Sequence, residues 1–165
     1  MAHVKIRFEV MNEVQVSRMF ETIEGQVLNL SKPFGEMAQD FYQSMVSEFS
    51  AEGAHEGNKK WEDLSPAYRQ WKQRHYPGKK ILELTGRLKG SITTSGSPDS
   101  VLDVQYDSLT VGTRVPYAVH HQTGTPRMPM RKIIDLTDLQ ARRWTQIMHV
   151  FLFSLYDEAA KSTRS

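Results

Sequence analysis

The stretch SLTVGTRVPYAVHHQTGTPRMPMRKII, residues 108–134, decides how the rest of the chain is organised. It begins with a short strand-like run that reaches Gly112, and it continues into a segment rich in tyrosine, histidine, glycine and threonine. Pro126 and Pro129 then bracket a loop before a second apolar run. Such a mixture is typical of a place where the chain changes direction between regular elements.

A structural corner explains this stretch better than a reactive site does. Pro116 can start a turn of helix, which would present Tyr117 and His121 on one side, because residues four apart share a helix face. Gly124 would then free the chain to fold back. We expect His121 and Arg131 to hydrogen-bond across the loop or to a neighbouring subunit.

The adjacent histidines His120 and His121 are the candidates for chemistry. Adjacent side chains diverge on a helix or a strand, so the two rings are not expected to hold one metal ion. A zinc site also needs further ligands, and the nearby sequence has no suitably spaced histidine or carboxylate pair. The chain has no Gly-x-Ser-x-Gly motif and no glycine-rich phosphate loop. We therefore expect no catalytic site, no metal and no cofactor, with a small hydrolase centred on these histidines kept as an alternative.

Composition places the chain among soluble globular proteins. Of 165 residues, 39% are hydrophobic and 24% are charged, which suits one domain spanning residues 1–165. The longest apolar runs are too short for a membrane span, and residues 1–10 do not resemble a signal peptide. Cysteine is absent, so we expect no disulfides and a reducing compartment such as the cytoplasm.

Hydrophobic periodicity predicts an α+β fold. Alternation over residues 4–10 indicates an N-terminal strand, and two apolar stripes at helical spacing predict a helical hairpin over 12–30 and 34–49. A polar, glycine-containing loop at 51–60 should be mobile. Ser65 can cap a short basic helix that begins at Pro66.

The second half should supply the sheet and a long final helix. Segments 91–95, 101–106 and 109–113 are strand candidates separated by turn signals, which predicts a small antiparallel sheet of about four to five strands. Thr137 or Asp138 can cap a C-terminal helix whose tail, at about 160–165, should fray.

The charge is distributed unevenly along the chain. Residues 1–56 hold 4 Lys/Arg against 9 Asp/Glu, whereas residues 57–90 hold 9 against 3. Aromatic residues interleave with the basic ones in segment 59–89, as in nucleic-acid contact surfaces. The simpler interpretation is an amphipathic helix with its aromatic residues in the core. The cations that could form a docking or DNA-facing surface are Lys59, Lys60, Arg69, Lys72 and Arg74.

Five motifs occur together in one order. They are Trp61-x-x-Leu64-Ser65-Pro66-x-Tyr68, Thr85-Gly86-x-Leu88-x-x-Ser91-Ile92, Val111-Gly112-Thr113, Tyr117-Ala118-x-x-His121-Gln122-x-Gly124-Thr125 and Met128-Pro129-x-Arg131. The apolar pair Ile81-Leu82 stands between the first two motifs. With this order and spacing, the chain resembles the tailed-phage virion morphogenesis family, also called tail completion or neck proteins. The resemblance spans about residues 4–160.

The resemblance implies a structural role. The chain would act in head–tail joining or tail completion, as a homo-oligomeric ring around the DNA passage, with six subunits as the expected copy number. Its partners would be neighbouring head-completion, connector and tail proteins, with non-specific contact to DNA in the channel and none to a membrane. It would reside in the neck or tail of the virion after assembly in the host cytoplasm. A DNA- or RNA-binding regulator that uses segment 59–89 remains the alternative.

Overall fold

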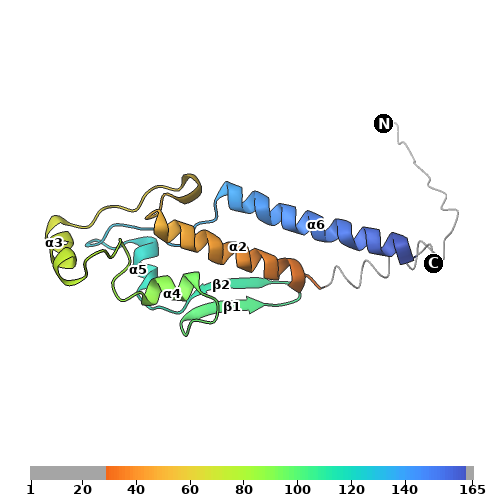
Figure 1. Ribbon diagram of the computed structural model, residues 1–165, viewed down its shortest axis with the longest axis horizontal. Helices are drawn as coiled ribbons and strands as arrows, with labels where there is room; N and C mark the ends of the chain where they lie inside the picture. Colours follow the sequence, from red (N-terminus) through yellow and green to blue (C-terminus); the bar gives the residue numbers. More distant parts are fainter. Residues whose placement is uncertain (1–28, 163–165) are drawn as a thin grey trace, which may run out of the picture.

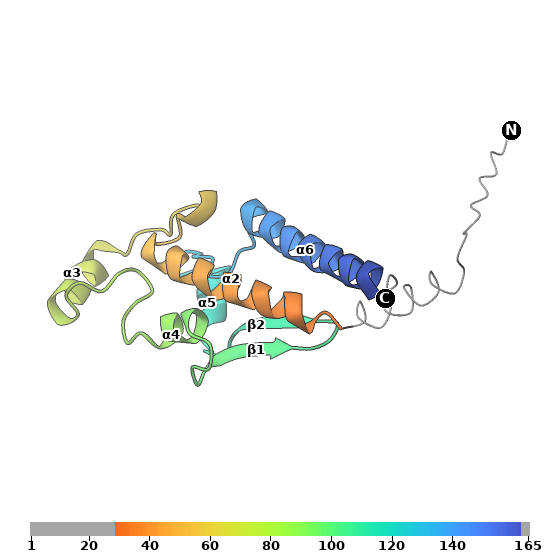
Figure 2. The same ribbon diagram turned by 45° about the vertical axis from the view of Figure 1, so that its right-hand side comes forward.

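The computed structural model describes residues 29–162. In chain order it contains helix α2 (Ser31–Ser50), the 3-10 turn η1 (His55–Gly57), helices α3 (Pro66–His75) and α4 (Arg87–Thr93), strands β1 (Ser100–Val104) and β2 (Leu109–Thr113), helix α5 (Ala118–Thr123) and helix α6 (Asp138–Ser162). The described part is elongated, with α2 and α6 side by side and α3 at one end (Figure 1 and Figure 2). The predicted strand 4–10 and nearly all of the predicted helix 12–30 lie outside the described residues.

Helix α2 is the element around which the others pack. It contacts α4, both strands and α6, and its apolar side chains share one face because they recur every three or four residues. Pro33 is tolerated in its first turn, where backbone N–H groups have no partner within the helix. The buried core cluster contains Phe41, Met45, Phe49, Trp61, Ile81, Leu88, Ile92, Val115 and Ile133. The prediction of this helix and of its buried face is therefore confirmed.

Strands β1 and β2 form an antiparallel hairpin beneath α2. Ser100 pairs with Thr113 and Val104 pairs with Leu109. The N–H of Gln105 donates to the carbonyl of Ser108 at 2.8 Å and closes the turn. Within residues 29–162 the sheet contains these two strands, so the prediction of four to five strands is not supported.

Residues 91–95, predicted as a strand, lie mainly in helix α4 instead. Ser91 and Ile92 are fully buried, and Ile92 packs in the core with residues of α2. The hydroxyls of Ser91 and Thr93 donate to the carbonyls of the preceding helical turn, at 2.8 and 2.9 Å. Packing of one helical face therefore overrides the strand preference of this β-branched segment.

Two further predicted helix starts, those of α3 and α6, are confirmed. The hydroxyl of Ser65 accepts the N–H of Tyr68 at the start of α3, and Pro66 is the first helical residue. The hydroxyl of Thr137 accepts the N–H of Gln140 at 3.0 Å and caps α6. Among the described helices, none combines the length and apolar character that a membrane crossing requires.

Candidate functional site

The corner at 108–134 begins where β2 leaves the sheet. The hydroxyl of Thr113 lies 2.7 Å from the hydroxyl of Ser91 in α4 and accepts the N–H of Val115 at 3.0 Å. Val115 is buried in the core, so the chain enters α5 from a fixed point. Tyr117 and His121 then lie edge to face, with 6.2 Å between their ring centroids. The two rings do share one side of the helix, as their spacing predicts.

Gly124 ends α5 in a conformation that favours glycine. Its φ is 74°, and a Cβ at this position would lie 3.0 Å from the backbone nitrogen of Met130. Beyond it, Thr125 and Met128 pair through two backbone hydrogen bonds and close a tight loop. The N–H of Arg131 donates to the carbonyl of His121 at 2.8 Å. The chain therefore folds back so close to α5 that a side chain at 124 would require Met130 to shift, in addition to the strain of the positive φ.

The Gln122 side chain binds the backbone of residues 133–134, the segment that folds back along α5. Its amide nitrogen donates to the carbonyl of Ile134 at 2.6 Å, and its amide oxygen accepts the N–H groups of Ile133 and Ile134 at 2.8 and 3.1 Å. The side chain thus occupies the place of a neighbouring strand and carries Ile133 into the core. This role of Gln122 was not predicted from the sequence, and its position inside the Tyr117–Thr125 motif is the only local signal for it.

Arg131 joins the corner to the chain around Trp61. Its guanidinium donates to the carbonyls of Glu62 and Asp63 at 2.7 and 3.1 Å, and the indole N–H of Trp61 donates to the carbonyl of Lys132 at 2.6 Å. Arg131 is only 5% exposed, and its burial lowers the pKa of the guanidinium, opposed by Glu62 and Asp63. Two segments about 70 residues apart in sequence are therefore joined by charge-assisted and neutral hydrogen bonds.

His121 has a different environment from its neighbour His120. Its Nδ1 is buried and has no hydrogen-bond partner among the described residues. Burial lowers the pKa of His121, and the charges of Arg131 and His120 lower it further, so the ring is neutral at neutral pH. The link from His121 to Arg131 runs through the backbone. A bond from the His121 ring to a neighbouring subunit stays a prediction.

The two histidines do not form a metal centre within residues 29–162. His120 is exposed, whereas His121 is half-buried against Tyr117. The described residues hold no group of three or more histidine, aspartate or glutamate side chains that could bind a metal ion. The geometry here is that of a packed joint between segments.

A cavity of about 510 Å³ opens beside the corner. Its walls come from three segments that are far apart in sequence, and they include Ser65, Tyr68, Gly86, Leu88, Tyr117, His121, Pro129 and Arg131. These residues belong to four of the five motifs quoted above. These four motifs therefore share one location in the fold, although each is too short to define it alone.

The predicted basic surface needs one correction. Four of its five cations are exposed: Lys59, Lys60, Arg69 and Arg74. Lys72 is only 4% exposed, and its ammonium group donates to the carbonyl of Lys80 in the loop that follows α3. Desolvation lowers the pKa of Lys72. Lys72 is therefore a structural cation that ties this loop to α3, and it does not belong to an exposed surface.

The aromatic side chains of α3 are exposed, contrary to the expectation that they lie in the core. Tyr68 stacks on Trp71 with ring centroids 5.4 Å apart, and His75 stacks on Trp71 at 5.0 Å. Tyr76 also contacts Trp71, at 5.7 Å. The buried side chain of α3 is that of Lys72, whereas the aromatic side chains stack on one another at the surface. Hydrophobic periodicity alone cannot predict this distribution.

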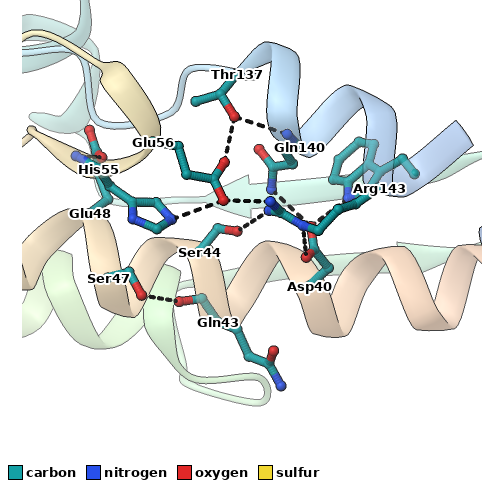
Figure 3. A network of polar contacts seen from close by, with 11 residues as sticks. Asp40, Gln43, Ser44, Ser47, Glu48, His55, Glu56, Thr137, Gln140 and Arg143 are labelled. Atoms are coloured by element: carbon teal, nitrogen blue, oxygen red, sulfur yellow. Dashed lines mark hydrogen bonds and ion pairs between the residues drawn. The ribbon is translucent and has the colours of Figure 1, made fainter. Parts of the chain in front are cut away.

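A polar network links α2, η1 and α6 (Figure 3). The Arg143 guanidinium donates to Asp40 at 2.7 Å, and it also binds Glu56 and the hydroxyl of Ser44. The indole N–H of Trp144 donates to Asp40 at 2.8 Å. This network was not predicted from the sequence, because its partners are about 100 residues apart and no local pattern connects them.

The carboxylates of this region titrate differently. Burial raises the pKa of Glu48 to about 7, because hydrogen bonds from the His55 backbone and from Asn58 only partly offset the desolvation. For Asp40, desolvation is outweighed by hydrogen bonds from Arg143 and Trp144, so its pKa lies below the usual value.

Loop 51–60 is bonded to both long helices: the N–H of His55 donates to Glu48 of α2, and Glu56 accepts from Arg143 of α6. The mobility of this loop stays a prediction.

Comparison with known proteins agrees with the motifs. The sequence model of the phage virion morphogenesis family matches residues 11–149, which is more than half of the chain. Neither the curated proteins nor the solved structures gave a match. The matched range contains all five motifs and every residue of the corner. The chain belongs to the phage virion morphogenesis family.

Proposed function

We propose that the chain is a structural subunit of a phage particle that acts in head–tail joining or tail completion. The observation that carries this proposal is the family match over residues 11–149. It describes an assembly role, and the corner geometry fits such a role, since Gln122 and Arg131 are engaged in holding segments together.

The proposed working form is a homo-oligomeric ring around the DNA passage, in the neck or the tail, with head-completion, connector or tail proteins above and below it. An elongated subunit with exposed apolar side chains suits lateral contacts of this kind. A heterologous contact closes into a ring when the rotation between subunits permits it.

Electron microscopy of the purified protein, with native mass spectrometry for the copy number, tests the ring. We expect closed rings with a central opening, and six subunits as the copy number. A protein that remains monomeric at all concentrations, and also in the presence of the adjacent connector or tail proteins, would contradict the proposal.

A nucleic-acid-binding role is the second candidate, because the aromatic side chains of α3 are exposed beside Arg69 and Arg74. Stacking on bases needs a free ring face, however, and Trp71 lies between Tyr68 and His75. Binding of a labelled DNA by the isolated protein, measured from 50 to 300 mM salt, separates the candidates. Sequence-specific binding that survives at the higher salt would favour a regulator.

A further inference from the structure

Two exposed aromatic surfaces lie at opposite ends of the described part of the chain. One is on α3 and the other is on the C-terminal half of α6, and the two views agree that these elements end far apart (Figure 1 and Figure 2). Exposed large apolar side chains that cluster together often mark a contact with another protein. The two surfaces therefore need partners.

The α3 surface is aromatic and basic. It is formed by Tyr68, Trp71, Arg69, Arg74 and Tyr76. Of the five lysines and arginines in residues 66–80, Lys72 is buried and the other four are exposed. The segment has no carboxylate of its own, and Arg69 is paired with Asp63 at 3.0 Å. Trp71 stacks on both Tyr68 and His75, so these rings form one continuous exposed surface that suits packing against other side chains. Tryptophan, tyrosine and arginine are the residues enriched at the centres of protein interfaces.

The α6 surface is apolar and acidic. It is formed by Val150, Phe153, Tyr156 and Asp157, which share one helix face at spacings of three and four, with exposed Leu152 and Glu158 on either side of that face. Phe153 is 71% exposed, the largest exposure among the large hydrophobic side chains of the described residues. Residues 149–162, the C-terminal half of α6, contain two carboxylates and one lysine, Lys161, and so carry a net charge of −1. This end of the molecule is therefore complementary in charge to the α3 end and similar to it in apolar character.

We infer that the α3 surface of one subunit binds the α6 surface of a second copy of this chain. The inference rests on the proposed ring and says which faces form it. Two different, complementary surfaces on one molecule give a head-to-tail contact, which leaves one surface free at each end until a ring closes. Opposite charges orient the subunits, and the aromatic side chains supply the desolvated centre of the contact.

Complementation between two interface variants tests this contact. Trp71→Ala removes the centre of the α3 surface, and Phe153→Ala removes the centre of the α6 surface. Each truncation is expected to weaken self-association about thirtyfold or more, as for central interface aromatics. Neither variant should form rings alone. A mixture should form dimers and nothing larger, because it keeps one intact pair of surfaces. Sedimentation velocity and native mass spectrometry distinguish these species.

Tyr106→Ala serves as the matched control. Tyr106 is an exposed aromatic residue in the turn between β1 and β2, on neither surface, so this variant should assemble like the wild type. Thermal melts of all variants establish that they are folded. Equal loss of assembly in the control would contradict the assignment of the two surfaces.

Several outcomes would overturn the inference. Rings that persist in both Trp71→Ala and Phe153→Ala would overturn it while leaving the proposed ring intact. Dimers formed by either variant alone would show a self-complementary contact instead. If Phe153→Ala lowers the melting temperature but leaves assembly unchanged, residues 1–28 of the same chain cover the α6 surface, and the inference is wrong. A wild-type protein that never assembles would overturn both the ring and this contact.

Discussion

Replacing Gln122 by methionine tests whether the corner is a structural joint. Methionine matches the length of glutamine and removes the amide, so the three hydrogen bonds to Ile133 and Ile134 are lost. The orientation of the amide is determined by its partners, because the opposite orientation would place its NH₂ group against two N–H donors. Each bond contributes about 1 kcal/mol, and an unpaired backbone group in a partly buried place costs about 1–3 kcal/mol.

The expected loss of unfolding free energy for Gln122→Met is therefore about 3 kcal/mol. For a domain of this size, this corresponds to a decrease in Tm of roughly 6–12 °C. Urea titration with circular dichroism gives the free energy, and a differential scan gives Tm. The variant should also have less protection from hydrogen exchange at Ile133 and Ile134.

Thr123→Val is the matched control for this variant. Thr123 is the next residue and is exposed, and its hydroxyl donates to the Val119 carbonyl within α5, where water can replace it. The control should change stability by less than about 0.5 kcal/mol. A loss below about 1 kcal/mol for Gln122→Met, similar to that of the control, would refute the role of Gln122 in fastening the returning chain.

Three further perturbations test other parts of the structure. Gly124→Ala should lower the free energy of unfolding by about 1–3 kcal/mol, and by more than Gly96→Ala does. Both positions have positive φ, but of the two only Gly124 lies close to the backbone of Met130. Equal losses of unfolding free energy in urea titrations would contradict this close approach. Glu48→Gln should gain stability relative to the wild type as pH rises. The folded-state pKa of Glu48 is raised to about 7, so the wild type loses stability from about pH 4.5 upward and reaches the full loss above pH 7. The gap between variant and wild type should grow by at most about 3 kcal/mol between pH 5 and 8.5, less where solvent screens the charge; a gap that is independent of pH would contradict the assignment. Asp40→Asn should lower the free energy of unfolding by about 1–3 kcal/mol at pH 7, because it removes the ion pair with Arg143 of α6. Below pH 4 the loss should be smaller, because protonation of Asp40 weakens this ion pair in the wild type. Denaturation curves at both pH values measure the difference, and an equal loss at both would count against the ion pair.

Helices with strong local signals could be predicted from the sequence. The apolar stripe of α2, the Ser65-Pro66 start of α3 and the Thr137 cap of α6 all depend on residues within one or two turns. The same kind of reasoning was wrong for residues 91–95. There the local preference for a strand is outweighed by burial of Ile92 against α2, which depends on residues about 50 positions away.

The site was predicted only where its contacts are local. Gly124 and the Tyr117–His121 pair follow from spacing within one turn of helix. Burial of Lys72 and exposure of Trp71 could not be predicted, because they depend on how the loop after α3 folds back. Hydrophobic periodicity tells which residues share a helix face, but it does not tell which face a short amphipathic helix turns inward.

The proposed role in particle assembly is tested most directly by removing the gene from a phage that encodes this chain. Electron microscopy of the resulting lysates shows the state of heads and tails. We expect separate heads and tails, or tails of abnormal length, with infectious particles restored when the wild-type chain is supplied. Normal numbers of complete, infectious particles in its absence would contradict the account.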